Sequence, residues 1–87
     1  MFYVYCLESE KYDELYFGYT KDLKRRFKEH NNKLNISTKR YVPWKIIYYE
    51  ACINEIDAKR REGYLKTSQG RRMMKARLKE YFYEKRN

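Results

Sequence analysis

Three short hydrophobic runs along the chain predict strands, and the charged segments between them predict helices. Residues 2–8 and 15–19 are aromatic and β-branched, and the turn-like residues between them favour an antiparallel hairpin. A third such run covers residues 44–51. Apolar positions at helical spacing predict helices over segments 22–31, 54–66 and 71–84. The order ββαβαα predicts an α+β domain in which helices pack against a three-stranded sheet.

Local signals mark the ends of these elements. Thr20 or Asp22 can cap the first helix, and residues 54–57, NEID, resemble a capping box at the start of the second. Residues 67–70, TSQG, are expected to interrupt the helical region before the last helix. Gly18, near the end of the second strand, indicates a bend or a close approach of another group to the backbone.

Composition makes this a folded domain with an unusual core. The chain has 87 residues, which is the size of a single domain over residues 1–87. Its mean hydropathy is -1.09 and 38% of its residues are charged, but 18% are aromatic and 11 are tyrosines. Disordered chains usually lack aromatic residues. We therefore expect a small core of amphipathic rings whose hydroxyl groups reach water or a partner.

The charge of the chain is positive and unevenly distributed. The formal net charge is +9, yet residues 1–20 contain one basic residue, Lys11, and four acidic residues. A surface with such an excess attracts polyanions, of which nucleic acid is the leading candidate. An acidic membrane surface is the competing partner, and a solvated face that only keeps the protein soluble is the third interpretation.

Cysteine usage and hydropathy indicate a cytoplasmic protein that does not enter the membrane. Cys6 and Cys52 lie in apolar runs and belong to no CxxC or Cys/His cluster, so we expect small core residues in a reducing compartment and no zinc site. The sequence contains no long apolar run and no signal-like N-terminus.

Helical periodicity places one arginine and one histidine at the edge of an apolar face. At 100° per residue, Arg26 and His30 lie one turn apart beside the face formed by Leu23 and Phe27, whereas the neighbouring basic residues point elsewhere. Arg26 then either snorkels from the rim of the core or takes part in a site.

The second helix repeats this arrangement with a carboxylate. Glu62 shares a face with Ala58 and Leu65, so it leans inward and needs an arginine, a tyrosine or a metal as partner. An ordinary structural ion pair is the alternative. Strand alternation places Tyr16 beside Gly18, and if Tyr5 faces the same side of the hairpin, the two phenols could meet Arg26, His30 and Glu62.

The order and spacing of these residues resemble a known family. YVY at residues 3–5, YFG at 16–18, DLKRRFKEH at 22–30 and AKRREGYLKTSQGRR at 58–72 resemble the GIY-YIG nuclease superfamily. The likeness is to its small single-domain bacterial branch (UPF0213-like) and to the nuclease domain of the excinuclease C subunit. The resemblance implies a three-stranded antiparallel sheet flanked by helices, and hydrolysis of phosphodiester bonds in DNA, or less favoured, RNA.

Carried over position by position, the resemblance implies a catalytic set of Tyr5, Tyr16, Arg26 and His30, with Glu62 as the metal-binding carboxylate. The sequence also departs from the family pattern. Tyr3 and Val4 replace Gly and Ile in the first motif, Phe17 replaces Ile in the second, and Tyr19 takes a position that is often basic, with Lys21 as a possible substitute. An asparagine that many family members carry in the last helix has no clear counterpart, and Ala76 is the candidate for its position.

The chemistry implied by the family needs a nucleophilic water and charge stabilisation at a phosphate. Glu62 can anchor one Mg²⁺ or Mn²⁺, and Arg26 can hold a non-bridging oxygen. Tyr16 is the first choice as general base, Tyr5 is its hydrogen-bond partner or the alternative base, and His30 relays or positions a proton. We expect nucleic-acid contacts at Gly18, Lys21, Lys39, Arg40, Arg71 and Arg72. The alternatives are a nucleic-acid-binding module with weak or lost catalysis, and a protein-interaction domain.

Overall fold

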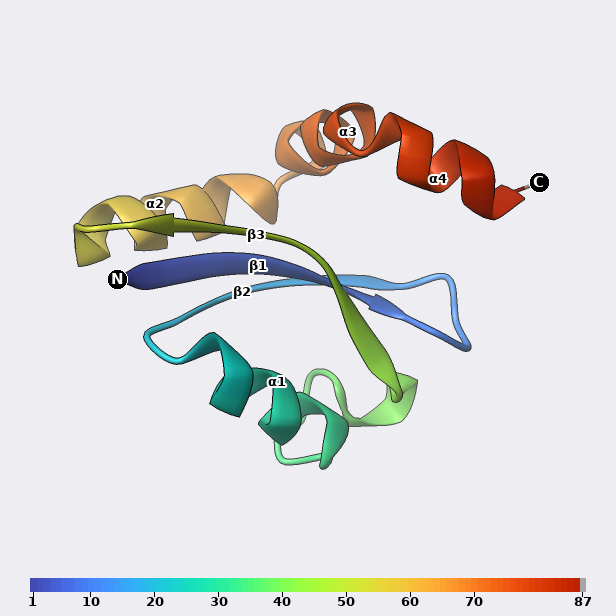
Figure 1. The fold of residues 1–87 in the computed structure, drawn as a ribbon, viewed down its shortest axis with the longest axis horizontal. Coiled ribbons are helices and arrows are strands. Elements are labelled where there is room, and N and C mark those ends of the chain that lie inside the picture. Colours follow the sequence, from blue (N-terminus) through green and yellow to red (C-terminus); the bar gives the residue numbers. More distant parts are fainter. Residues whose placement is uncertain (87) are drawn as a thin grey trace.

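The computed structural model describes residues 1–86 and contains one antiparallel sheet with helices on both of its faces (Figure 1). The strands lie in the order β2-β1-β3, so β1 is central and both other strands are edges. The elements in chain order are β1 Phe2–Ser9, β2 Leu15–Thr20, α1 Leu23–Asn31, a short 3₁₀ helix Lys39–Tyr41, β3 Trp44–Cys52, α2 Glu55–Leu65, α3 Ser68–Arg77 and α4 Lys79–Arg86. The predicted α+β fold with a three-stranded antiparallel sheet is confirmed.

The register of the hairpin decides which side chains share a face. Tyr5 of β1 lies opposite Gly18 of β2, and Leu7 lies opposite Tyr16. Residues directly opposite each other in an antiparallel pair point to the same side of the sheet. Tyr5 and Tyr16 therefore face the same side, which is the condition that the sequence left open.

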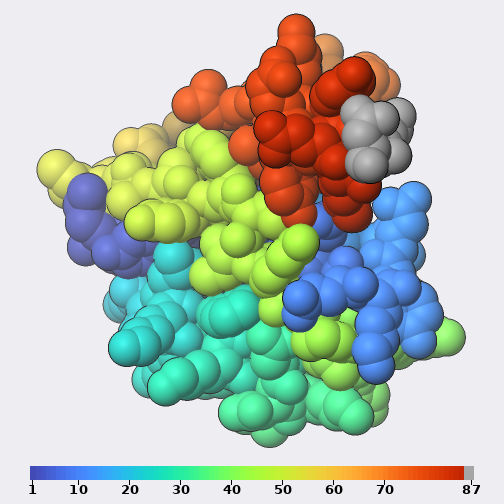
Figure 2. Space-filling view, turned by 45° about the vertical axis from the view of Figure 1, so that its right-hand side comes forward, coloured from blue at the N-terminus to red at the C-terminus, as the bar shows by residue number. Residues whose placement is uncertain are grey.

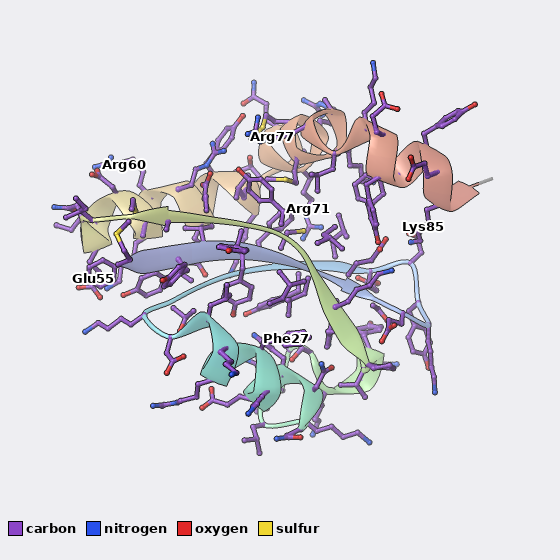
Figure 3. All side chains as sticks on the ribbon, in the orientation of Figure 1. Phe27, Glu55, Arg60, Arg71, Arg77 and Lys85 are labelled. Carbon is purple, nitrogen blue, oxygen red and sulfur yellow. The ribbon has the colours of Figure 1, made fainter. Side chains whose placement is uncertain are left out.

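Each face of the sheet carries its own hydrophobic cluster. On one face, Tyr5, Leu7 and Trp44 pack with residues of α1, of which Phe27 lies between the helix and the sheet (Figure 3). On the other face, Val4, Cys6 and Phe17 pack against buried residues of α2 and α3, namely Ala58, Leu65 and Met74. Figure 1 shows this division, with α1 on one side of the sheet and α2, α3 and α4 on the other.

The helix starts follow the capping signals. The Asp22 carboxylate accepts a hydrogen bond from the Arg25 amide at 3.1 Å, so Asp22, and not Thr20, caps α1. The Asn54 side chain caps α2 by accepting from the amides of Ile56 and Asp57. Both helices therefore begin where the sequence places them.

The last helical region differs from the expectation of one helix over residues 71–84. Thr67 acts as an N-cap, accepting from the Gly70 amide at 3.0 Å, so TSQG starts α3 at Ser68 and does not delay it to residue 71. A break at Leu78 then separates α3 from α4. Gly70 is buried against the end of α2, where an added Cβ would overlap with the Tyr64 carbonyl. This close contact lets the two helices meet directly after the cap.

The helix α4 is tied to the sheet through a buried carboxylate. Glu8 is only 2% exposed, and it accepts hydrogen bonds from the Tyr81 hydroxyl and the Lys85 ammonium of α4. Lys85 extends from α4 toward the sheet in Figure 3, and Figure 2 shows α4, in red, lying near the blue hairpin of β1 and β2. Helix α4 is thus held against strand β1 by these hydrogen bonds.

The structure also bears on two expectations drawn from composition, one about the cysteines and one about the membrane. Cys6 is buried, whereas Cys52 is only partly covered, so the prediction that both cysteines are core residues holds for Cys6 alone. Both are free thiols. Among the described residues, no helix combines the length and the apolar character needed to cross a membrane.

Candidate active site

The site is built around Tyr5, whose ring lies across Gly18 of the neighbouring strand. A Cβ added at Gly18 would overlap with the Tyr5 ring and hydroxyl, so only glycine leaves room for this ring. The close approach predicted at Gly18 is therefore a side chain of the adjacent strand. Tyr5 itself is only 2% exposed, which makes it part of the core on the α1 face.

Helix α1 carries His30 to this phenol. His30 is fully buried, and its Nε2 lies 2.8 Å from the Tyr5 hydroxyl while its Nδ1 lies 2.8 Å from the Thr38 hydroxyl. Burial, followed by the charge of Arg26, lowers the pKa of His30 from 6.5 to about 4. His30 is therefore a neutral imidazole at neutral pH, held at both nitrogens.

The protonation of Tyr5 depends on its burial and on three neighbouring groups. Burial is the main cause that raises the pKa of Tyr5 from 10.0 to about 12, and the charges of Tyr16 and Glu62 raise it further. A hydrogen bond from the Arg26 guanidinium opposes this effect. Tyr5 thus stays protonated at neutral pH, and its pKa depends on residues from β2, α1 and α2.

Arg26 lies at the rim of this pocket, as the helical periodicity predicts. Its Nη1 donates to the Glu29 carboxylate at 2.9 Å, and Arg25 reaches the same carboxylate at 3.3 Å. The side chain of Arg26 is 32% exposed, whereas that of Arg25 is 76% exposed. Arg26 alone therefore combines a contact with the buried phenol and access to solvent.

Tyr16 occupies the more open part of the site. Its ring is half-buried, with its centroid 5.1 Å from that of His30 and 6.4 Å from that of Trp44. The ammonium of Lys66, at the end of α2, lies 5.5 Å from the centroid of the same ring. Because β2 is an edge strand, side chains of α2 can reach Tyr16 around that edge.

Glu62 is the residue of the set that could hold a metal ion. Its side chain is 24% exposed, it lies 3.3 Å from Lys66, and its charge acts on Tyr5. It is therefore partly buried, and its charge raises the pKa of Tyr5. Among the described residues, no group of three or more His, Cys, Asp or Glu side chains could enclose a metal. This donor set fits one hydrated Mg²⁺ or Mn²⁺, since Mg²⁺ commonly uses one or two carboxylates and keeps several waters.

The residues expected to contact nucleic acid lie apart from one another. Lys21 covers the ring of Phe2, Arg40 covers Tyr41 beside Lys39 in the 3₁₀ helix, and Arg71 covers Phe17. The side chain of Phe17 belongs to the cluster on the opposite face from Tyr5, and Arg72 is exposed on α3. The structure therefore distributes these cations over several surfaces and does not gather them at the catalytic set.

Three residues of the site were not predicted. Glu29 and Lys66 follow Arg26 and Glu62 at helical spacings of three and four, so a search for charged pairs would have found them. Thr38 lies in the loop after α1, eight residues from His30, and no periodicity points to it.

Tyr19, at the position often basic in similar sequences, donates instead to the Glu55 carboxylate, which raises the pKa of Tyr19 to about 12.

Comparison with known proteins matches most of the chain. Residues 1–77 match the family described as the GIY-YIG catalytic domain. A UPF0213 protein of Clostridium perfringens is 40% identical over 67 residues, which cover 76% of this chain and 71% of that relative. No solved structure matches the chain.

Proposed function

Because the chain belongs to the GIY-YIG family of nucleases, we propose that it is a metal-dependent endonuclease that hydrolyses phosphodiester bonds in nucleic acid, with DNA preferred over RNA. The observation that supports the proposal is that Tyr5 and Tyr16 both contact His30 on the α1 face, where Arg26 and Glu62 also act on the pKa of Tyr5. These residues come from β1, β2, α1 and α2. We also assign this activity to a single domain over residues 1–87 and to the cytoplasm.

Arg26 is suited to bind the scissile phosphate. Its guanidinium is held by the Glu29 carboxylate at 2.9 Å, it acts on the pKa of the neighbouring Tyr5, and it is partly exposed. A fixed planar fork can hold a non-bridging phosphate oxygen and stabilise the charge that develops there in the transition state. Because Arg26 is anchored before the substrate arrives, little reorganisation is needed when the phosphate binds.

Tyr16 is the group assigned to take the proton from the attacking water. Tyr5 is buried, is hydrogen-bonded to His30 and has a pKa raised to about 12, so it stays protonated at neutral pH and is not available as a base. Tyr16 is half-buried, and the Lys66 ammonium lies 5.5 Å from the centroid of its ring. We therefore assign the base role to Tyr16 and a positioning role to Tyr5 and His30.

Nucleases of this family generally depend on a metal ion. Glu62 is the residue that would hold one Mg²⁺ or Mn²⁺, and the bound ion would supply charge stabilisation at the phosphate. Lys66 pairs with Glu62 at 3.3 Å, so its ammonium would leave that carboxylate when the ion binds.

A cleavage assay with matched variants tests this proposal. Labelled single- and double-stranded DNA and RNA are incubated with the protein in Mg²⁺, Mn²⁺ or EDTA. We expect Glu62→Gln to abolish metal-dependent cleavage, while Asp57→Asn, an exposed carboxylate of the same helix, keeps it. We expect Arg26→Ala to lose about a hundredfold or more in rate, and its exposed neighbour Arg25→Ala to stay near the parent. Full activity in Glu62→Gln would contradict the assignment.

A binding module without catalysis is the second candidate. It is favoured by the single carboxylate of the site, which is already paired with Lys66, and by Ala76, an exposed residue of α3 that carries no amide at the position read as the family asparagine. In that case the parent protein binds nucleic acid in the same assays but leaves it intact in every metal. Binding without cleavage would therefore select this candidate.

A further inference from the structure

Three buried polar side chains form a continuous hydrogen-bonded row beneath the site. Tyr5, His30 and Thr38 are at most 2% exposed, and each contact along the row measures 2.8 Å. Neutral imidazole has one N–H and one lone pair, so one ring nitrogen donates and the other accepts. The hydrogen bonds of the row can therefore be oriented in only two ways. Either Tyr5 donates to Nε2 and Nδ1–H donates to Thr38, or Thr38 donates to Nδ1 and Nε2–H donates to Tyr5.

The groups around the Tyr5 hydroxyl favour the orientation in which Tyr5 donates to His30 Nε2. The Arg26 guanidinium, which can only donate, lowers the pKa of Tyr5, so it favours a lone pair of the Tyr5 oxygen on its side. The Tyr5 proton then needs an acceptor, and His30 Nε2 is the acceptor that the structure gives it at 2.8 Å. If Nε2 carried a proton instead, the buried phenol would face donors at both of these contacts and its own proton would lack this partner.

The surroundings of the Thr38 hydroxyl favour the same orientation of the hydrogen bonds. The Thr38 hydroxyl faces the backbone carbonyl of Asn35 at 3.5 Å, and a carbonyl can only accept. With its proton directed there, the Thr38 oxygen is free to accept from His30 Nδ1–H. Both ends thus favour the proton of His30 on Nδ1 and the lone pair on Nε2.

We propose that Thr38 is a positioning residue of the nuclease site, which fixes the Nδ1–H form of His30 and thereby turns the Tyr5 O–H into the core and the Tyr5 lone pair toward Arg26. The proposal rests on the nuclease function proposed above. In this arrangement Tyr5 supports the guanidinium that binds the phosphate, and Thr38 acts on the reaction only through His30 and Tyr5.

The loop around Thr38 is held in a way that suits this role. The Thr38 carbonyl accepts from Trp44 Nε1 at 2.9 Å, and the Thr38 amide donates to the Asn35 carbonyl at 3.2 Å. Asn31, at the end of α1, also bonds the backbone of Trp44 through both atoms of its amide. The hydroxyl is therefore presented to His30 by backbone that is anchored on both α1 and β3.

The tautomer can be read directly, because His30 is the only histidine of the chain. In a protein labelled with ¹⁵N-histidine, protonated and unprotonated ring nitrogens have well separated shifts, and every signal belongs to His30. We expect the parent and Thr38→Ser to show a protonated Nδ1 and an unprotonated Nε2. Thr38→Val keeps the side-chain shape but removes the acceptor, so we expect the Nε2–H form to appear.

Kinetics test whether the tautomer matters for the reaction. We expect Thr38→Val to lower kcat roughly 10- to 100-fold with little change in KM, as is common when a residue that orients a functional group is lost. Thr38→Ser should restore kcat, because its hydroxyl can accept from the same Nδ1–H. This rescue separates an orienting hydroxyl from a residue that only fills space.

Defined outcomes overturn the inference. A parent protein with Nε2–H, or a Thr38→Val protein with unchanged tautomer and kcat, would show that Thr38 does not orient His30. If Thr38→Val fails to fold, the tautomer of the parent and of Thr38→Ser still decides the question. Loss of nuclease function is a different result: a parent that cleaves nothing but shows Nδ1–H contradicts the proposed function and leaves the orientation of His30 by Thr38 supported.

Discussion

At the scale of single residues, the active-site geometry depends on the missing side chain of Gly18. The Tyr5 ring occupies the space where a Cβ would lie, and both residues belong to a paired part of the sheet that cannot easily move apart. We expect Gly18→Ala to lower the free energy of unfolding by about 1–3 kcal/mol, because the ring must shift or the strands must separate. Urea unfolding measures the change.

Gly63 provides the matched control for Gly18→Ala. It lies in α2, it is exposed, and an added Cβ would meet nothing within 4 Å. We expect Gly63→Ala to raise the free energy of unfolding by about 0.5–1 kcal/mol, since alanine loses less conformational entropy in a helix. Equal effects of the two substitutions would mean that Tyr5 does not depend on Gly18.

The buried His30 should make stability depend on pH in a defined direction. Its pKa falls from 6.5 in the unfolded chain to about 4 in the fold, so the unfolded state binds more protons between these values. The stabilising contribution is present above pH 6.5 and is lost as the pH falls toward 4, at about 1.4 kcal/mol per pH unit. We expect His30→Gln to remove this slope in urea unfolding measured from pH 7 to 5. An unchanged slope would contradict a buried, neutral imidazole.

Some residues of the candidate site could be predicted from the sequence, and others could not. Arg26, His30 and Glu62 could be singled out because helical periodicity converts spacing into direction, and all three are buried or partly buried. Thr38 could not be found in this way. Its contact with His30 depends on the path of an irregular loop, and that path is fixed by distant bonds such as the one from Trp44 to the Thr38 carbonyl.

At the scale of elements, α4 depends on one carboxylate for its place. Glu8 of β1 is buried, and Tyr81 and Lys85 of α4 both donate to it, with Lys45 at 3.9 Å. Glu8→Gln removes the charge that pairs with Lys85. We expect a loss of about 1–3 kcal/mol in the free energy of unfolding, moderated because Lys85 is 42% exposed and can return to water.

Hydrogen exchange locates this effect within the chain. The amides of α4 should lose protection in Glu8→Gln, whereas those of the paired strands β1 and β3 should keep it. Glu84→Gln, an exposed carboxylate on α4 itself, is the control and should leave both unchanged. A Glu8→Gln protein with full protection in α4 would show that the helix is held by other contacts.

Element boundaries were predictable where one side chain decides them. Asp22 and Asn54 cap α1 and α2 as the sequence indicates. The break at Leu78 was missed, because residues 71–84 contain neither glycine nor proline and read as one helix. The bonds from Glu8 to Tyr81 and Lys85 join residues more than seventy positions apart, so local propensity carries no information about them.

At the scale of the whole molecule, the sheet separates two groups of residues. One face, with α1 and the following loop, carries most of the proposed catalytic set, and the other, with α2, α3 and α4, carries the second hydrophobic cluster and the link to Glu8. Glu62 and Lys66 of α2 act on residues of the first face around the edge of the sheet formed by β2. A strand at the edge is thus what allows residues from both layers to meet.

The net charge of +9 predicts how this molecule binds nucleic acid. Cations that neutralise phosphates release condensed counterions, so affinity for duplex DNA should fall linearly on a plot of log affinity against log salt. Because Lys39 and Arg40 lie together in the exposed 3₁₀ helix, we expect their double replacement by glutamine to reduce the slope by about two, close to 0.9 per lost phosphate contact.

Arg60 gives the control for this titration. It is 73% exposed, it pairs with Asp57 at 3.1 Å, and it extends away from the sheet (Figure 3). Its replacement by glutamine should leave the slope unchanged, because a cation already paired at a distance from the sheet contributes little to phosphate binding. Since phosphate contacts carry no sequence information, the Lys39 and Arg40 variant should weaken binding equally for unrelated sequences. Affinity that does not respond to salt would instead mean that a polyanion is not the partner of this basic surface.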